Sequence, residues 1–171
     1  MRTHLVTAPA PEIFLRAATP DDEPFLHALY GDRRAPELVA AGWGPDEART
    51  FIDMQFRAQQ AGYGATFPDA DHWVVELGGE PIGRMLVRRR PEGDLVVDIV
   101  VHSRHRGLGI GTALMQEVIG DADAAGRGVS LTVAAHDRRV VEWYERLGFV
   151  VGEQHGPYLG MRWQPAAGDG R

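Results

Sequence analysis

One block of sequence, residues 94–125, constrains the fold more than any other, because it predicts a strand, a glycine-rich turn and a helix in direct succession. Its first part, DLVVDIVV, is rich in valine and isoleucine, a composition typical of a fully buried strand. Its last part carries apolar residues at steps of three and four, as amphipathic helices do. The buried face of this helix is expected to contain Ile110, Leu114, Val118, Ala122 and Ala125.

The turn between this strand and helix contains three glycines, Gly107, Gly109 and Gly111, in the sequence RGLGIG. Glycine lets the backbone approach a ligand closely and adopts conformations that a Cβ atom forbids. A helix that begins at such a turn directs several unpaired N–H groups, and the positive end of its dipole, at one point. The turn therefore predicts an anion site, most often one for phosphate.

Three kinds of glycine loop compete for this turn. A Walker A loop requires a lysine after its second glycine, and the chain contains no lysine. The dinucleotide fingerprint GxGxxG has Thr112 where its third glycine belongs. It should also open the first strand–helix unit of a sheet, whereas this turn lies past the middle of the chain. The third pattern, R/Q-x-x-G-x-G/A, is met by Arg106, Gly109 and Gly111.

The third pattern resembles motif A of the GNAT acetyltransferase superfamily. The segment VHSRHRGLGIGTALM is similar to the family's V-x-P-x-[YH]-R-G-x-G-[IV]-G-x-x-L, with Ser103 where the family often has proline. Further along, VVEWYERLGFV resembles motif B, A-x-x-x-Y-x-x-x-G-F. The resemblance implies an N-acetyltransferase that depends on acetyl-coenzyme A. The two motifs cover only the second half of the chain, and the first half matches the family in layout alone.

The order of the predicted elements agrees with this resemblance. The resemblance implies an α+β (α/β) GNAT fold, in which about seven strands form a mixed, mostly antiparallel central sheet flanked by about four helices. Splayed strands would form the acetyl-coenzyme A cleft. Residues 12–163 are expected to form one domain, with flexible tails over residues 1–11 and 164–171. The predicted strands are residues 12–18, 72–77, 81–90, 95–101, 129–134, 149–153 and 157–163, and the predicted helices are residues 20–33, 45–61, 110–125 and 138–147.

The resemblance also implies which residues hold acetyl-coenzyme A. Its pyrophosphate would lie against Arg106, Gly107, Leu108, Gly109, Ile110, Gly111 and Thr112. Its pantetheine arm would fill a gap beside the central strand, where Ile99 and Val101 offer backbone groups. The amide near Val100 would polarise the thioester carbonyl as a small oxyanion hole. The alternative is an ordinary core strand followed by a glycine turn.

Tyr144 is the candidate acid, because motif B places a tyrosine beside the coenzyme A sulfur. A phenol with a pKa of ~10 can donate a proton to a thiolate whose parent pKa is ~8.5 if the two meet as charge develops. The alternative is an aromatic residue that only packs, with its hydroxyl satisfied. Asp137 stands near the position of the family's asparagine and suits the N-cap of the helix that carries Tyr144.

The candidate base is Asp98 on the central strand, with His102, His136 or a chain of water molecules as alternatives. A base is needed because an alkyl amine with a pKa of ~10.4 is almost entirely protonated at neutral pH. The chain has no cysteine and no triad motif, which favours direct transfer in a ternary complex over a covalent enzyme intermediate. The histidines show no metal-binding spacing, so no metal is expected.

Composition limits the partners. A formal net charge of −6 over 171 residues gives no electrostatic argument for binding nucleic acid or an anionic membrane. Anionic coenzyme A would need local positive charge, which Arg104, His105 and Arg106 supply at the turn. The arginines at residues 88–90 either add to that charge or form a solvated strand end.

We expect a soluble, cytoplasmic protein, because the sequence shows neither a bilayer-spanning run nor a signal-peptide core. The acceptor would be a small-molecule or peptide amine, and a homodimer is compatible with the fold. The alternative functions are a non-catalytic acyl-coenzyme A-binding or regulatory module and, less favoured, a dinucleotide-dependent oxidoreductase.

Overall fold

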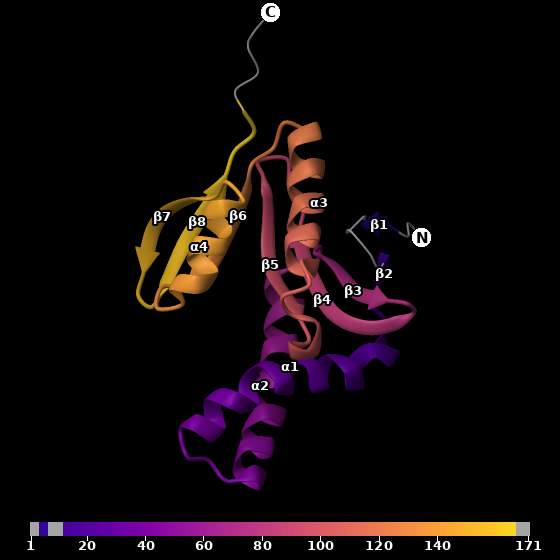
Figure 1. Ribbon diagram of the computed structural model, residues 1–171, viewed down its shortest axis with the longest axis vertical. Helices are drawn as coiled ribbons and strands as arrows, with labels where there is room; N and C mark the ends of the chain where they lie inside the picture. Colours follow the sequence, from indigo (N-terminus) through magenta and orange to yellow (C-terminus); the bar gives the residue numbers. More distant parts are fainter. Residues whose placement is uncertain (1–3, 7–11, 167–171) are drawn as a thin grey trace, which may run out of the picture.

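A single mixed sheet organises the molecule (Figure 1). The computed structural model describes residues 4–6 and 12–166. Its eight strands lie in the order β1-β2-β3-β4-β5-β6-β8-β7, and every neighbouring pair is antiparallel except β5 and β6. This confirms the predicted mixed, mostly antiparallel sheet. The strands are β1 (His4–Val6), β2 (Ile13–Ala17), β3 (Asp71–Leu77), β4 (Glu80–Arg88), β5 (Asp94–Val101), β6 (Val129–Ala134), β7 (Val150–His155) and β8 (Tyr158–Trp163).

Four α-helices and two 3-10 turns complete the described part of the chain. The helices are α1 (Glu23–Ala40), α2 (Pro45–Thr66), α3 (Ile110–Ala124) and α4 (Arg138–Arg146). The 3-10 turns are η1 (Pro20–Asp22) and η2 (Ser103–His105). In Figure 1, α1 and α2 lie at one end of the sheet, beside the turn that joins β5 to α3. The site predicted at that turn is thus bordered by the first two helices.

The start and the first helices of the chain differ from the sequence prediction. His4–Val6 pairs with β2, whereas a flexible tail was expected over residues 1–11; residues 1–3 and 7–11 lie outside the described part. Helix α1 continues past residue 33 through Pro36 to Ala40, and α2 continues past residue 61 to Thr66. Packing accounts for the longer α1, because Leu38 is buried against Ala48 and Ile52 of α2. Residues 164–166 have no regular secondary structure, and residues 167–171 lie outside the described part.

The main core lies between α3 and the sheet. Leu114, Met115, Val118 and Ala122 of α3 are completely buried. The same core contains buried apolar side chains of β4, β5 and β6, together with Tyr144 of α4. This burial confirms the apolar helix face read from the sequence at Ile110, Leu114, Val118 and Ala122, whereas Ala125 lies just past the end of α3 and is exposed.

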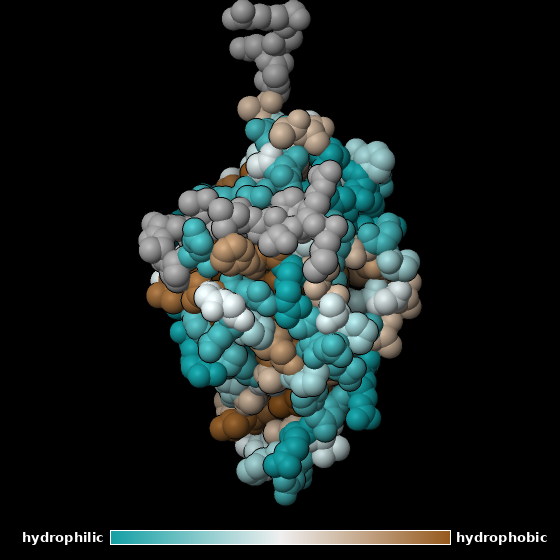
Figure 2. Space-filling view, turned by 90° about the vertical axis from the view of Figure 1, so that its right-hand side faces the viewer, coloured by the Kyte–Doolittle hydropathy of each residue, from teal (hydrophilic) through white to brown (hydrophobic). Residues whose placement is uncertain are grey.

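The α1–α2 hairpin exposes apolar side chains at its tip. Figure 2 shows apolar atoms gathered at the lower end of the molecule, where this hairpin lies. Val39, Trp43 and Met54 are exposed there, and the Trp43 ring lies 5.0 Å from that of Phe51. No helix in the described ranges is long and apolar enough to cross a membrane.

Strands β5 and β6 separate part-way along their length. They pair only where Asp94, Leu95 and Val96 face Val129, Ser130 and Leu131. Beyond that point β5 stays paired with β4 as far as Val101, while β6 stays paired with β8 as far as Ala134. The second half of β5 therefore has one edge without a strand partner, as the predicted splayed cleft requires.

The arginines at residues 88–90 lie at the opposite end of β5 from the glycine turn. Arg89 Nη1 is 3.1 Å from the buried carboxylate of Asp94, the first residue of β5. Arg88 pairs with Asp69, and Arg90 lies 3.6 Å from Glu92. These arginines are therefore structural ion-pair partners and do not add positive charge to the predicted phosphate site.

The close approach of β4 to β5 can be tested at Gly83. A Cβ atom at this position would lie 2.6 Å from the Val100 carbonyl oxygen. We expect Gly83→Ala to lower the free energy of unfolding by about 1–3 kcal/mol, as overpacking does, measured by urea denaturation followed by tryptophan fluorescence. The control is Gly120→Ala in α3, where no atom lies within 4 Å of the added carbon. Equal stability of the two variants would contradict the approach of the two strands.

Candidate active site

The turn between β5 and α3 is open and glycine-dependent. Gly107 and Gly109 both have a φ of 78°, in the left-handed region that favours glycine, and Gly109 is the N-cap of α3. No atom lies within 4 Å of a Cβ built on either residue. Between them Leu108 is 58% exposed, whereas Ile110 is buried and anchors the start of α3 in the core. The turn thus presents bare backbone to the space above it.

The backbone amides of this turn are donors in need of an acceptor. Within the described ranges, the N–H groups of residues 107–112 have no hydrogen-bond acceptor, and the first helical bond runs from Ala113 N to Gly109 O. Six consecutive amides at the positive end of a helix form a favourable site for a phosphate or diphosphate. The residues present therefore fit the pyrophosphate of coenzyme A.

Arg106 connects this turn to the free edge of β5. Its Nε donates a hydrogen bond to the Val101 carbonyl, at 3.1 Å, and its Nη2 lies 3.6 Å from the Asp32 carboxylate. About half of the side chain remains exposed. A guanidinium held in this way beside six unpaired amides adds a positive charge where the predicted anion would lie.

The free edge of β5 is formed by the backbone of Ile99 and Val101. His102 N donates to Ile82 O of β4, at 2.8 Å, so the backbone of His102 faces β4. Because successive residues of a strand direct their backbone groups to opposite edges, Val100 also faces β4, and Ile99 and Val101 face the gap. The Val100 amide therefore does not face the gap, and the amides available on that edge are those of its neighbours Ile99 and Val101.

Tyr144 is buried in α4. The side chain is 5% exposed, and its ring packs edge-on against Phe149, with 5.4 Å between the centroids. Burial, and then the charge of Asp98, raise the pKa of the Tyr144 hydroxyl well above its usual value, while Arg33 opposes the shift. The phenol is therefore protonated at neutral pH, which is the state that a proton donor needs.

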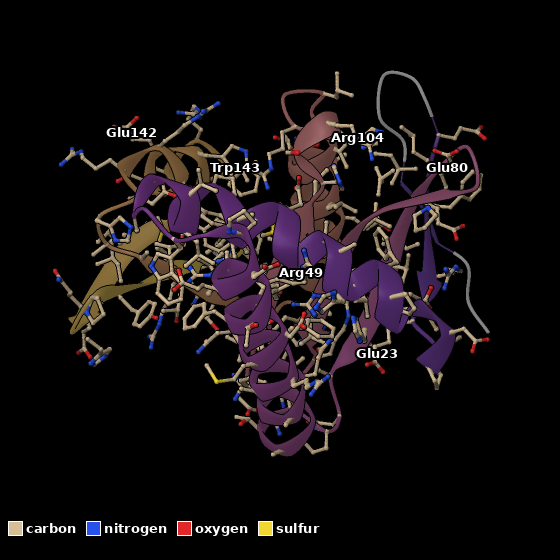
Figure 3. The ribbon with its side chains drawn as sticks, turned by 90° about the horizontal axis from the view of Figure 1, so that it is seen from below. Glu23, Arg49, Glu80, Arg104, Glu142 and Trp143 are labelled. Atoms are coloured by element: carbon tan, nitrogen blue, oxygen red, sulfur yellow. The ribbon has the colours of Figure 1, made fainter. Side chains whose placement is uncertain are left out.

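Trp143, the neighbour of Tyr144, ties α4 to the glycine turn. Its Nε1 donates a hydrogen bond to Thr112 Oγ1, at 3.1 Å, and its ring lies 3.5 Å from a Cβ built on Gly111. In Figure 3, seen from below, Trp143 and Arg104 appear on opposite sides of α3. The predicted acid and the predicted phosphate site thus belong to one packed unit, a link that the two separate motifs do not reveal.

Asp98, the candidate base, lies in a charged network. Its carboxylate accepts a hydrogen bond from the buried Arg84 and lies 3.6 Å from Arg33 of α1. Arg84 also donates to Gln59 and Gln60 of α2. The network therefore joins β4, β5, α1 and α2 through one carboxylate.

Tyr63 belongs to the same network. The guanidinium carbon of Arg84 lies 5.3 Å from the centre of the Tyr63 ring. Burial, followed by the charge of Asp98, raises the pKa of Tyr63 to about 12. The sequence offered Tyr63 as a candidate for the acceptor pocket or for core packing, but it did not single out Arg33 or Arg84 for this site. The one available signal was Arg84 itself, an arginine within the apolar run IGRMLV, where a buried guanidinium needs a carboxylate partner.

The remaining candidates from the sequence are spread around the site. Asp137 caps α4, as predicted, by accepting a hydrogen bond from Val140 N at 3.2 Å. His102 Nε2 lies 3.7 Å from Asp32, and His136 is exposed in the connection before α4. No cluster of three or more histidines, cysteines or carboxylates that could hold a metal occurs among the residues described.

A family comparison agrees with this arrangement. The model of the "Acetyltransferase (GNAT) family" matches residues 26–149, which is more than half of the chain. The chain belongs to the GNAT acetyltransferase family. The match begins in α1 and therefore includes helices for which the sequence motifs gave only the layout.

Curated relatives in the family share part of the chain. Serotonin N-acetyltransferase 2 of Oryza sativa subsp. japonica is 34% identical over 84 residues, covering 46% of this chain and 41% of its own length. Mycothiol acetyltransferase of Corynebacterium glutamicum is 31% identical over 121 residues, covering 70% of this chain and 40% of its own length. The chain thus spans less than half the length of these relatives.

Solved structures share the fold over nearly the whole chain. The PaiA N-acetyltransferase of Thermoplasma acidophilum, solved in complex with coenzyme A, has a TM-score of 0.67 at 14% identity and covers 89% of this chain and 98% of its own. An acetyltransferase of Thermus thermophilus has a TM-score of 0.65 at 17% identity and covers 94% of this chain and 99% of its own. At such low identity, these matches establish the fold alone.

The buried ion pair at Asp98 generates a stability prediction. Asp98→Ala leaves the Arg84 guanidinium buried without its main partner, so we expect the free energy of unfolding to fall by about 3–5 kcal/mol in urea denaturation. The double variant Asp98→Leu, Arg84→Met removes both charges and should recover most of that loss. Asp46→Ala, at a side chain that is 95% exposed, serves as the control and should leave the midpoint unchanged. A double variant as unstable as Asp98→Ala would show that the two side chains are not coupled.

Proposed function

We propose that this protein transfers an acetyl group from acetyl-coenzyme A to a primary amine, directly and within a complex that holds both substrates. One observation carries the proposal: the six unpaired amides of residues 107–112 lie beside the unpaired edge of β5. An anion site alone would suit many phosphates. An anion site next to a strand edge suits a long ligand with a diphosphate at one end and an amide-bearing arm at the other.

Acetyl-coenzyme A supplies a thioester whose carbonyl carbon accepts the amine. The residues that act on it follow from the geometry. The amides of residues 107–112 and the Arg106 guanidinium bind the diphosphate, and Val101, which adjoins that end, pairs with the amides of the arm. The Ile99 amide, which faces the gap farther along β5, is the donor for charge that develops on the carbonyl oxygen.

Two proton transfers complete the reaction as a carbon–nitrogen bond forms and the carbon–sulfur bond breaks. Asp98, or a water molecule bound to it, takes the proton of the amine. This assignment is supported by the raised pKa of Tyr144, to which burial contributes most and the charge of Asp98 contributes next. Tyr144 gives its proton to the departing sulfur and recovers one from solvent.

The acceptor is an amine that enters between the first two helices and the strand ends. The names of relatives and neighbours indicate acceptors as different as serotonin and the alanine of a ribosomal protein. A screen of arylalkylamines, amino acids and alanyl peptides, with detection of the free thiol released from acetyl-coenzyme A, would identify the class. A cytoplasmic location and a homodimer stay predictions.

Replacing Tyr144 tests the proposed acid. We expect Tyr144→Phe to lower kcat by about 10²-fold or more, because general acid catalysis typically contributes that much, with coenzyme A affinity unchanged in calorimetry. The packing against Phe149 is retained, since only the hydroxyl is lost. Tyr158→Phe, at a side chain that is 55% exposed on β8, is the control and should turn over like the wild type.

The outcomes separate the enzyme from its main alternative. Unchanged turnover in Tyr144→Phe would remove Tyr144 as the acid while leaving the transfer reaction intact. Binding of acetyl-coenzyme A without turnover on any amine in the screen would favour a non-catalytic acyl-coenzyme A-binding module. The absence of any heat on titration with acetyl-coenzyme A would overturn the proposed function.

A further inference from the structure

Ser103 occupies a backbone position that suits proline. It is the first residue of η2, and proline is favoured at the first position of a helical turn because its φ is fixed there and its missing N–H is not needed. The preceding residue, His102, has a ψ of 140°, within the range that a following proline imposes, although its φ of −52° lies outside that range. The turn therefore keeps the shape of a proline turn, although serine stands where the motif often has proline.

A carboxylate from α1 holds Ser103 in this shape. Ser103 N donates to Asp32 Oδ2 at 2.8 Å, and Ser103 Oγ donates to Asp32 Oδ1 at 2.5 Å. Both donors belong to serine, because proline has neither an N–H group nor a hydroxyl. Two hydrogen bonds to one carboxylate thus restrain a residue that lacks the stiffness of a proline ring.

Asp32 is placed to keep its charge. Its side chain is 16% exposed. Burial raises the pKa of the Asp32 carboxyl, but the hydrogen bonds from Ser103 and the charges of His102 and Arg106 lower it by more, so the pKa lies below its usual value. The same carboxylate lies 3.6 Å from Arg106 Nη2, and Arg106 Nε is bound to the Val101 carbonyl. Asp32 therefore contacts both the start of the turn and the guanidinium beside the six unpaired amides.

We propose that Asp32 is a positioning residue that locks the β5–α3 turn through Ser103, in the place of the motif's proline, and aims Arg106 at the diphosphate. The diphosphate part rests on the proposed function. Asp32 orders the turn before the ligand arrives, so the ligand does not bear the entropic cost of ordering it. Loss of Asp32 should then weaken cofactor binding more than it slows the chemical step.

The single variants measure the lock. We expect Asp32→Ala to weaken the binding of coenzyme A in calorimetry about tenfold to a hundredfold, the loss that corresponds to one hydrogen bond to a charged group. KM for acetyl-coenzyme A should rise by a similar factor with kcat changed little. Asp32→Asn keeps the shape of the side chain and loses its charge, so its affinity for coenzyme A should lie between those of Asp32→Ala and the wild type. This variant also keeps the test usable if Asp32→Ala fails to fold. Asp46→Ala controls for the change in net charge.

The rescue variant separates the lock from a general effect of charge. In the Asp32→Ala background, Ser103→Pro should restore most of the lost affinity, because the ring fixes φ without the carboxylate. Amide hydrogen exchange over residues 104–109, followed without any ligand, should be faster in Asp32→Ala and slow again in the double variant. Recovery in both measurements supports the lock.

Two results would overturn the proposal. One is wild-type affinity for coenzyme A, together with wild-type exchange, in Asp32→Ala. The other is a double variant that binds no better than Asp32→Ala, because ordering of the turn through Ser103 would then contribute nothing to affinity. Failure of the proposed function is a separate result, since it appears as absent binding in the wild type, whereas the exchange measurement needs no ligand.

Discussion

The separation of β5 from β6 after three paired residues is the constraint on which the site depends. Backbone N–H and C=O groups at the edge of a strand are strong hydrogen-bonding groups, and folded proteins rarely leave them without partners. Here β4 holds one edge of β5 as far as Val101, so the strand stays extended while its other edge is open. The open edge ends where the glycine turn begins, which makes the two features one continuous backbone surface.

Charge is organised locally in this acidic protein. The arginines at the start of β5 are neutralised by Asp94 and other carboxylates, and Arg84 is neutralised by Asp98. Arg106 differs from these because about half of its side chain is exposed. A net charge of −6 is therefore compatible with a site for an anion, because the amides and one guanidinium supply the field at short range.

The sequence predicted what short segments encode. The glycine turn, the buried face of α3 and the Asp137 cap all depend on residues within a few positions of one another. The sheet order and the splayed strands followed from the family resemblance. The sequence did not predict contacts between distant segments. Asp32 and Ser103 are 71 residues apart in the chain. Arg84 joins Asp98 to α2 through side chains that local periodicity does not connect. The direction of the Val100 amide, which faces β4, likewise depends on the register with that strand.

Asp32 and Arg33 are adjacent in α1, yet they serve different parts of the site. Asp32 holds the turn that faces the proposed diphosphate, and Arg33 lies beside Asp98, whose charge reaches Tyr144. Because consecutive residues of a helix move as one rigid body, any displacement of α1 must alter both regions together. A shift of α1 at the glycine turn is therefore expected to move Arg33 beside Asp98 as well, so the turn and the Asp98 network should respond to such a shift together.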